Sequence, residues 1–334
     1  MKRLICLFVA FTLLCSAFVG CNTPRNETSL NSSTESVSSE PQPFPVTVRD
    51  VTIGAEPTRV VSLSPMLTDL ICEYGYEDKL VGRSSNCMFS TTVLRLPDVG
   101  TAAEPKLEEI IKLSPEYVFT TQPLSEDTIM WLSKNNIAVI TLTHPSSIKE
   151  LTGIYSDITV IFEGKLDGLV KGAKNAQAFT DKLDELKLKI ERYRRDNSMD
   201  SAVSVMIIHS LDNYIAAGST IENDILEYIG IGNAASDSHG YFVSDDALKS
   251  INPHYIAVSP QVDVDELSIK SAYKVKTAVK QGNIITVNTA PIEKCSINLI
   301  SAFYEIAEAV YPGVTDTDIS TTIDETVSQQ SVLN

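Results

Sequence analysis

Hydrophobic and polar residues follow two alternating periods along the chain from about residue 59 onward. Short apolar runs rich in β-branched residues predict strands, first over residues 59–63, 79–82, 116–120 and 138–142. Segments whose apolar residues recur every three or four positions predict helices over residues 68–74, 106–113 and 126–135. Strands that alternate with helices at this spacing indicate a parallel sheet with helices packed against it.

The pattern changes between residues 146 and 195, where no strand is expected. Residues 146–162 predict one amphipathic helix, and residues 165–195 predict a second one, with apolar residues at helical spacing at Phe179, Leu183, Leu186, Ile190 and Tyr193. A helix of about thirty residues spans about 45 Å, which is longer than one small domain needs. The heptads are too few for a coiled coil, so we interpret this helix as a rigid strut between two lobes.

After the strut the α/β order resumes. Strands are expected over residues 202–208, 255–258 and 284–287, and helices over 220–230, 245–251 and 296–310. The sequence therefore predicts an α/β fold with two lobes, each with a parallel sheet, joined by a single long helix. Clefts between lobes are common ligand sites, so we expect a ligand cleft there.

The N-terminus has the features of a secretory signal. Met1-Lys2-Arg3 is cationic, and the apolar run after it, about 16 residues long, is short for a membrane-spanning helix, which needs roughly 20. Residues 17–21 resemble a bacterial lipobox, which implies that Cys21 is lipidated; a plain cleaved signal is the alternative. The polar stretch from residue 22 to about 45 cannot bury enough apolar surface to fold and is interpreted as a tether.

These segments give the predicted domain organisation. The expected parts are a signal peptide (1–20), a lipidated cysteine and disordered tether (21–50), an N-terminal α/β lobe (51–163), a linking helix (164–197), a C-terminal α/β lobe (198–313) and a disordered acidic tail (314–334). The sequence thus predicts an extracytoplasmic protein that is held to the bacterial cell membrane by lipid.

Composition narrows the function classes. The chain of 334 residues has 43 acidic and 27 basic side chains and a net charge of −16, which argues against a nucleic-acid partner. Cys72, Cys87 and Cys295 remain after export, without the spacing of a disulfide framework or zinc site. The four histidines are scattered, which argues against a site for a free metal ion. The chain has no GxSxG, HExxH or GxxxxGK[ST] motif, so we predict no catalytic residues and no enzyme.

Several motifs resemble, in order and spacing, the solute-binding proteins of ABC importers for cobalamin, haem and ferric siderophores. The resemblance runs from about residue 57 to 312, and its most specific stretches are Arg59-Val60-Val61-Ser62-Leu63-Ser64-Pro65, Leu96-Pro97-Asp98-Val99-Gly100, Gly230-Ile231-Gly232-Asn233-Ala234, Ile251-Asn252-Pro253 and Lys280-Gln281-Gly282-Asn283-Ile284. It implies two Rossmann-like lobes, no enzymatic activity, no resident cofactor, a metal-chelate cargo and an ABC permease as partner of a monomeric, membrane-anchored protein.

The resemblance also implies site residues. Expected cargo contacts in the loops that face the cleft are Ser64, Pro65, Met66, Ser85, Asn86, Cys87, Thr101, Ala102, Gln122, Asn213, His239, Tyr241 and Lys294. Family members dock on the permease through one acidic residue from each lobe, and these positions correspond to Glu108 and Asp246.

The cargo class remains open at this stage. A planar metal macrocycle needs flat apolar walls and sometimes an axial donor; the candidate walls are Tyr214, Tyr241, Phe242 and Phe89, and the candidate donors are His239, favoured by its loop, with His209, Met66 and Cys87. Anionic ferric siderophores need cations, and the expected cleft loops offer only Arg83 and Lys294, opposed by Glu104 and Glu293. We therefore favour a corrinoid, with ferric siderophore or haem next. The alternatives are an exported enzyme that acts on a chelate, and a surface receptor or adhesin.

Overall fold

The computed structural model describes residues 42–87, 92–201 and 203–316. The chain divides into two units, Met1–Pro41 and Gln42–Asn334. The expected signal, Cys21 and most of the expected tether lie outside the described residues, as do Phe89 and residues 317–334. All that follows concerns the second unit.

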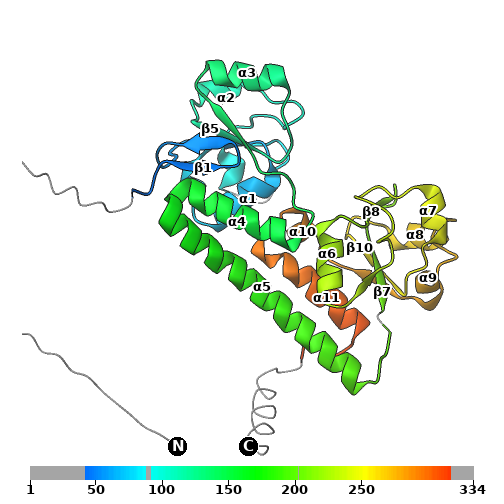
Figure 1. Ribbon diagram of the computed structural model, residues 1–334. Coiled ribbons are helices and arrows are strands. Elements are labelled where there is room, and N and C mark those ends of the chain that lie inside the picture. Colours follow the sequence, from blue (N-terminus) through cyan, green and yellow to red (C-terminus); the bar gives the residue numbers. More distant parts are fainter. Residues whose placement is uncertain (1–41, 88–91, 202, 317–334) are drawn as a thin grey trace, which may run out of the picture. The chain divides into compact units, whose positions relative to one another are not determined.

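The N-terminal part of this unit, here called the N-lobe, contains a four-stranded parallel sheet in the order β4-β3-β5-β6. Its strands are β3 (Val60–Ser62), β4 (Leu80–Arg83), β5 (Tyr117–Thr120) and β6 (Ala138–Thr141), and its helices are α1 (Pro65–Glu73), α2 (Leu107–Lys112) and α3 (Glu126–Lys134). The predicted alternation of strands and helices is therefore confirmed for this lobe (Figure 1).

A small antiparallel hairpin precedes this sheet. Strands β1 (Val46–Val48) and β2 (Val51–Ile53) pair across a turn at Arg49, whose φ is 52°. The side chains of Val46, Val48 and Ile53 are buried in the core. The hairpin lies partly inside the range 21–50 that the sequence assigns to a tether, because three-residue strands give too short an apolar pattern to be distinguished from loop.

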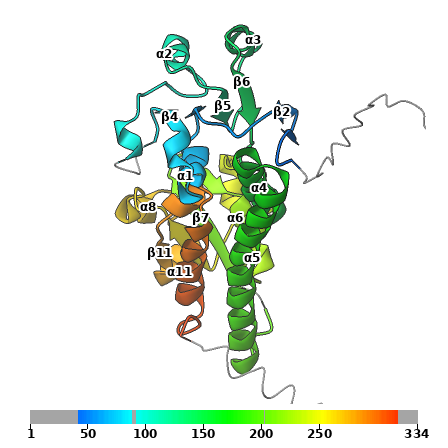
Figure 2. The ribbon, with the colours of Figure 1, turned by 90° about the vertical axis from the view of Figure 1, so that its left-hand side faces the viewer.

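Helices α4 (Ile148–Glu163) and α5 (Lys165–Asp196) pack closely against each other. Two glycines on α5 allow the approach, since a Cβ on Gly168 would lie 2.5 Å from Val160 Cα and one on Gly172 would lie 2.6 Å from Ser156 Cα. The apolar stripe of α5 is buried at Phe179, Leu183, Leu186 and Ile190. The predicted long helix is thus confirmed, and α11 (Ile300–Val310) runs beside it (Figure 2).

The C-terminal part, here called the C-lobe, is built around β7 (Ser204–Ser210). The other strands are β8 (Tyr214–Ala216), β9 (Gly232–Asn233), β10 (Tyr255–Val258) and β11 (Ile284–Thr286), and the helices are α6 (Ile221–Tyr228), α7 (Asp245–Ser250), α8 (Val264–Ile269) and α9 (Thr277–Gln281). β7, β9, β10 and β11 are parallel, as expected. β8 was not predicted and pairs antiparallel with β7 after a turn at Asn213, whose φ is 60°.

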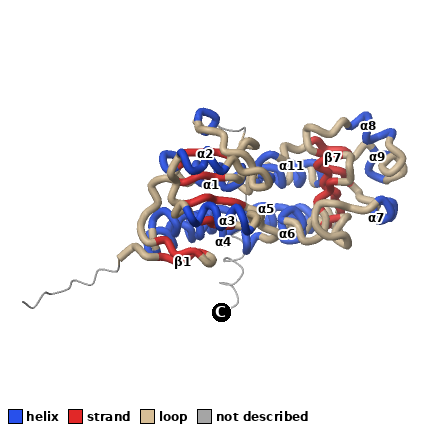
Figure 3. Tube along the Cα trace, turned by 90° about the horizontal axis from the view of Figure 1, so that it is seen from above, coloured by secondary structure: helices blue, strands red, loops and turns tan. Residues whose placement is uncertain are grey.

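Besides α5, the segment after β11 makes a second contact between the lobes. After β11 the chain forms α10 (Ala290–Glu293) and a short 3₁₀ turn (Ile297–Leu299) before α11. The Tyr155 hydroxyl of α4 donates a hydrogen bond to the Cys295 carbonyl at 3.1 Å, and Lys294 Nζ lies 3.3 Å from Asp69 Oδ2 of α1. Both α5 and α11 therefore extend between the strands of the two lobes (Figure 3).

The start of the expected acidic tail is bonded to the helical layer. Thr315 donates its backbone N–H and its hydroxyl to Glu308 of α11, and its carbonyl accepts a hydrogen bond from Lys189 of α5. None of the helices in the described residues has both the length and the apolar character of a membrane span.

Candidate functional site

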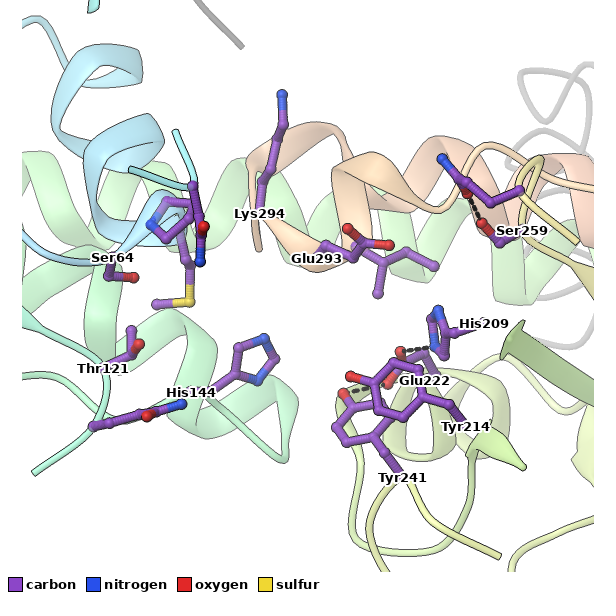
Figure 4. A pocket seen from close by; sticks show the side chains of 16 residues that line it. Ser64, Thr121, His144, His209, Tyr214, Glu222, Tyr241, Ser259, Glu293 and Lys294 are labelled. Atoms are coloured by element: carbon purple, nitrogen blue, oxygen red, sulfur yellow. Dashed lines mark hydrogen bonds and ion pairs between the residues drawn. The ribbon is translucent and has the colours of Figure 1, made fainter. Parts of the chain in front are cut away.

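A cavity of about 680 Å³ lies between the two lobes. Its lining comes from segments that follow parallel strands of both sheets, from α6 and from α10, and consists of Ser64, Pro65, Met66, Asn86, Thr121, Gln122, His144, His209, Tyr214, Glu222, Tyr241, Ser259, Gln261, Ile292, Glu293 and Lys294 (Figure 4). The carboxyl ends of parallel strands are the usual ligand sites of open α/β sheets, because the loops there converge from several strands.

Neutral polar groups form much of the N-lobe wall. Ser64 follows β3 and caps α1, and its Oγ accepts a hydrogen bond from the Leu67 N–H. Gln122 follows β5, where its N–H donates to the Thr120 hydroxyl. Because capping and turn bonds fix the backbone at both places, Ser64 and Gln122 face the cavity from defined positions.

His144 completes the N-lobe wall after β6. Its Nδ1 lies 3.2 Å from the Pro145 carbonyl oxygen, and its Nε2 lies 3.5 Å from the Sγ of Cys295. Burial lowers the pKa of His144, since the imidazolium form loses its hydration. The attraction of Glu222 for the imidazolium opposes this effect only in part. His144 is therefore a neutral imidazole at pH 7.

Aromatic rings dominate the C-lobe wall. The ring centroids of Tyr214 and Tyr241 are 5.2 Å apart, and His209 lies 5.2 Å from Tyr214 and 5.8 Å from Tyr241. His144 approaches Tyr241 edge-on at 6.5 Å from the opposite lobe. The rings give the cavity one apolar, flat-sided wall that suits a planar or bulky organic ligand.

A buried carboxylate lies behind these rings. Glu222 stands in the first turn of α6, which Thr220 caps, and is only 1% exposed. Its Oε1 lies 3.1 Å from His209 Nε2, and its Oε2 accepts a hydrogen bond from the Tyr241 hydroxyl at 2.9 Å (Figure 4). Burial and the Glu222 carboxylate together raise the pKa of Tyr241, so this phenol stays protonated.

The charged residues of the lining are few. Lys294 is paired with Asp69, while Glu222 and Glu293 contribute two carboxylates. Among the described lining residues there is no arginine; Arg83 donates to the Ser84 carbonyl and is not part of the lining. Nor do three or more histidine, cysteine, aspartate or glutamate side chains come together anywhere in the described residues in a way that could hold a metal ion.

The structure brings together about half of the residues that the sequence proposes as cargo contacts. Those that line the cavity are Ser64, Pro65, Met66, Asn86, Gln122, Tyr241 and Lys294. Those that do not are Ser85, Cys87, Thr101, Ala102, Asn213 and His239.

Most of the residues outside the lining have structural partners instead. Ser85 donates to Asp98, Asn213 donates to Asp245, and the Cys87 thiol, buried in the N-lobe, lies 3.2 Å from the Thr68 hydroxyl. Thr101 accepts from the Glu104 N–H, and His239 lies 3.4 Å from Ser219. The imidazoles at the cavity are thus His144 and His209, and not His239.

Sequence reasoning missed Glu222. In a sequence, an acidic residue in the first turn of a helix is usually a solvated side chain that interacts favourably with the helix dipole. Only the contacts of Glu222 with His209 and Tyr241 distinguish it from such a residue. Of the other candidate walls, Tyr214 lines the cavity, whereas Phe242 packs beside Tyr214 outside the lining and is 75% exposed.

The two acids proposed for docking are on the surface. Glu108 lies in the first turn of α2 and Asp246 in the first turn of α7, and both side chains are exposed. Asp246 is paired with Lys249 at 2.8 Å on its own helix. One exposed carboxylate on each lobe is therefore available at a short helix outside the cavity.

Comparison with known proteins gives the family. The model of the periplasmic binding protein family matches residues 60–290, so the chain belongs to that family. It is 27% identical over 326 residues, 93% of this chain and 98% of the relative, to the Bacillus subtilis protein described as "Uncharacterized ABC transporter substrate-binding lipoprotein YvrC". It is 26% identical over 285 residues, 80% of this chain and 74% of the relative, to a cobalamin-binding protein of Halobacterium salinarum.

Solved structures agree on the fold. A periplasmic haem-binding protein from Pseudomonas aeruginosa superposes with a TM-score of 0.63 at 18% identity, over 77% of this chain and 93% of that chain. The expected two-lobed α/β fold with a long linking helix is thus confirmed.

Proposed function

We propose that the protein is the substrate-binding lipoprotein of an ABC importer, and that its cargo is a corrinoid. It would act as an extracytoplasmic monomer, held to the membrane by lipid on Cys21, and pass cargo from the interlobe cavity to the permease. Membership of the periplasmic binding protein family and similarity to relatives named as substrate-binding and cobalamin-binding proteins support this.

The choice of a corrinoid as cargo rests on the composition of the cavity wall. The rest of the lining includes neutral polar side chains that can both donate and accept hydrogen bonds, and they are Ser64, Asn86, Thr121, Gln122, Ser259 and Gln261. A corrin ring carries neutral amide groups around its rim, and amides need donors and acceptors of this kind. The tyrosine rings offer apolar surface for the face of the macrocycle.

The charge of the wall argues against the competing cargoes. Haem carries two propionate carboxylates, and ferric citrate is anionic, so both need cationic partners. The described lining offers Lys294, which is already paired with Asp69, together with the carboxylates of Glu222 and Glu293. An anionic cargo would therefore meet a wall of its own sign, whereas a neutral corrinoid would not.

Docking on the permease is proposed to use Glu108 of α2 and Asp246 of α7. Each is an exposed carboxylate on its own lobe, and arginines of a permease would pair with them. A carboxylate from each lobe would let the permease recognise both halves of the protein at once.

The absorbance spectrum of the protein purified from its native host tests the cargo class. A corrinoid that copurifies would give the absorbance bands of a corrin, and this is the expected result. A Soret band would show haem instead, and a ferric charge-transfer band would show a siderophore; either outcome would overturn the corrinoid assignment.

A further inference from the structure

Glu222 is a buried carboxylate in the aromatic C-lobe wall of the cavity. It is 1% exposed and lines the cavity behind Tyr241, and within the described part of the chain its carboxylate contacts His209 and Tyr241. Burying a carboxylate is costly, and a glutamine of the same shape could accept the same hydrogen bond from Tyr241. The charge itself therefore calls for a functional explanation.

The surroundings of His209 bear on how far this charge is compensated. His209 Nε2 lies 3.1 Å from Glu222 Oε1, while its buried Nδ1 has no hydrogen-bond partner among the described residues. An imidazolium would place a second N–H donor on Nδ1 and leave it unsatisfied in the interior, which is unfavourable. The neutral Nε2–H tautomer satisfies the contact with Glu222 without placing a donor on Nδ1, and in that form the pair with Glu222 has a net negative charge.

The effect of Glu222 extends across the cavity. Burial and then the Glu222 carboxylate raise the pKa of Tyr214, and the same carboxylate opposes the burial that lowers the pKa of His144 in the opposite lobe. In a partly desolvated cavity such a charge acts over several ångströms, because the screening by water is weak.

We infer that Glu222 is a specificity-determining residue, whose buried carboxylate rejects cargo that bears carboxylates. The inference rests on the proposed function in that it concerns the same cavity and cargo. It adds a reason for the discrimination: an anion close to Glu222 is repelled.

A pair of corrinoids tests the inference on the unaltered protein. One is dicyanocobinamide, which carries rim amides, and the other is the same compound after hydrolysis of rim amides to carboxylates. The amide form is expected to bind at least about 10-fold more tightly. Two like charges about 6 Å apart, at a dielectric constant between those of water and a dry protein interior, repel strongly enough to change a binding constant by that factor or more. Equal affinity for the two would overturn the inference.

The variant Glu222→Gln tests the residue directly. It keeps the shape and the hydrogen bond from Tyr241 but removes the charge, so the preference for the amide corrinoid is expected to fall at least about 10-fold and hemin to bind correspondingly more tightly. Glu227→Gln is the matched control, because Glu227 is exposed on the same helix outside the cavity lining. That control is expected to retain the wild-type preference.

Tyr241→Phe separates charge from ring position. It removes the hydroxyl that bonds Glu222 and leaves the carboxylate in place, so rejection of carboxylate-bearing cargo is expected to persist.

Thermal unfolding of each variant establishes that it is folded. If Glu222→Gln is folded and its preference is unchanged, the inference is wrong while the corrinoid assignment stands. If the wild type binds no corrinoid but binds hemin, the proposed function is wrong, and the effect of Glu222→Gln on hemin still decides the inference.

Discussion

Lys294 Nζ lies 3.3 Å from Asp69 Oδ2, and this ion pair ties the segment after the last C-lobe strand to the first helix of the N-lobe. The side chains are only 22% and 18% exposed. Since Ile292, Glu293 and Lys294 line the cavity, one part of the cavity wall is held by contacts with both lobes.

Replacement of Lys294 by methionine is expected to destabilise the protein by about 2 kcal/mol at pH 7, because Asp69 is left partly buried without this partner. Burial already raises the pKa of Asp69 although Lys294 opposes it, and loss of the lysine would raise that pKa further. A carboxyl group whose pKa is raised in the folded protein carries no penalty when it is protonated at low pH. It lowers the free energy of unfolding once the pH exceeds that pKa and the group becomes charged. Urea unfolding should therefore show a deficit that shrinks as the pH falls from 7 towards 4.

A suitable control for this pair is Lys112→Met, which removes an exposed ion pair with Glu109. No measurable change of stability is expected there. A deficit of Lys294→Met that stayed constant with pH would contradict the role assigned to Asp69.

The close approach of α4 and α5 predicts the effect of two glycine substitutions. Gly168→Ala and Gly172→Ala should each destabilise by about 2 kcal/mol or more, because the new Cβ meets backbone atoms of α4 within 2.7 Å, and this exceeds the gain of about 1 kcal/mol in helix propensity. Gly153→Ala on α4 has no atom within 4 Å of the new Cβ and should stabilise by about 0.5–1 kcal/mol. Equal effects at all three positions in chemical denaturation would refute the packing argument.

His144 predicts a pH dependence of stability. Because burial lowers its pKa in the folded protein, the unfolded chain binds more protons below pH 6.5, and folding loses free energy as the pH falls through that window. His144→Gln should remove this contribution, so that the wild type loses stability faster than the variant between pH 6.5 and 5, by at most about 1.4 kcal/mol per pH unit. Parallel curves for the two proteins would show that His144 does not titrate as described.

The docking proposal predicts a separation of binding from transport. The double variant Glu108→Lys, Asp246→Lys should bind cargo as the wild type does, because neither residue lines the cavity, yet support uptake at least about 10-fold less well in the native host. Glu126→Lys changes an exposed acid in the first turn of α3 and serves as the control. Wild-type uptake by the double variant would eliminate these two residues as the docking pair.

Much of the fold is predictable from the sequence because most strands and long helices bury periodic apolar faces. The stripe through Phe179 and Ile190 and the β-branched runs of β3 and β10 have this property. The hairpin β1–β2 and the antiparallel strand β8 were missed, because these three-residue strands include exposed or half-buried positions, whereas the equally short β3 is buried throughout. Their pairing depends on turns at Arg49 and Asn213 that adopt positive φ, a conformation that is uncommon for arginine and more readily adopted by asparagine.

The site was only partly predictable for a different reason. Loops that follow strands can be located in a sequence, and for this reason Ser64 and Gln122 were predicted correctly as lining residues. The direction of each side chain depends on its neighbours in the fold, which the sequence pattern does not give. His239 and His209 are both close to cleft loops in the sequence, and only the paired strands β7 and β8 determine that His209 lies against Tyr214. His254 lies outside the cavity lining, and its Nδ1 is 2.8 Å from the Ser204 hydroxyl at the start of β7.

A competition titration of the purified protein with dicyanocobinamide, hemin and ferric citrate tests the central claim most directly. The cavity lining combines neutral polar side chains with the carboxylates of Glu222 and Glu293, so it repels anions. The corrinoid is therefore expected to bind at least about 10-fold more tightly than either anionic chelate. Binding of hemin or ferric citrate more tightly than the corrinoid would contradict the account.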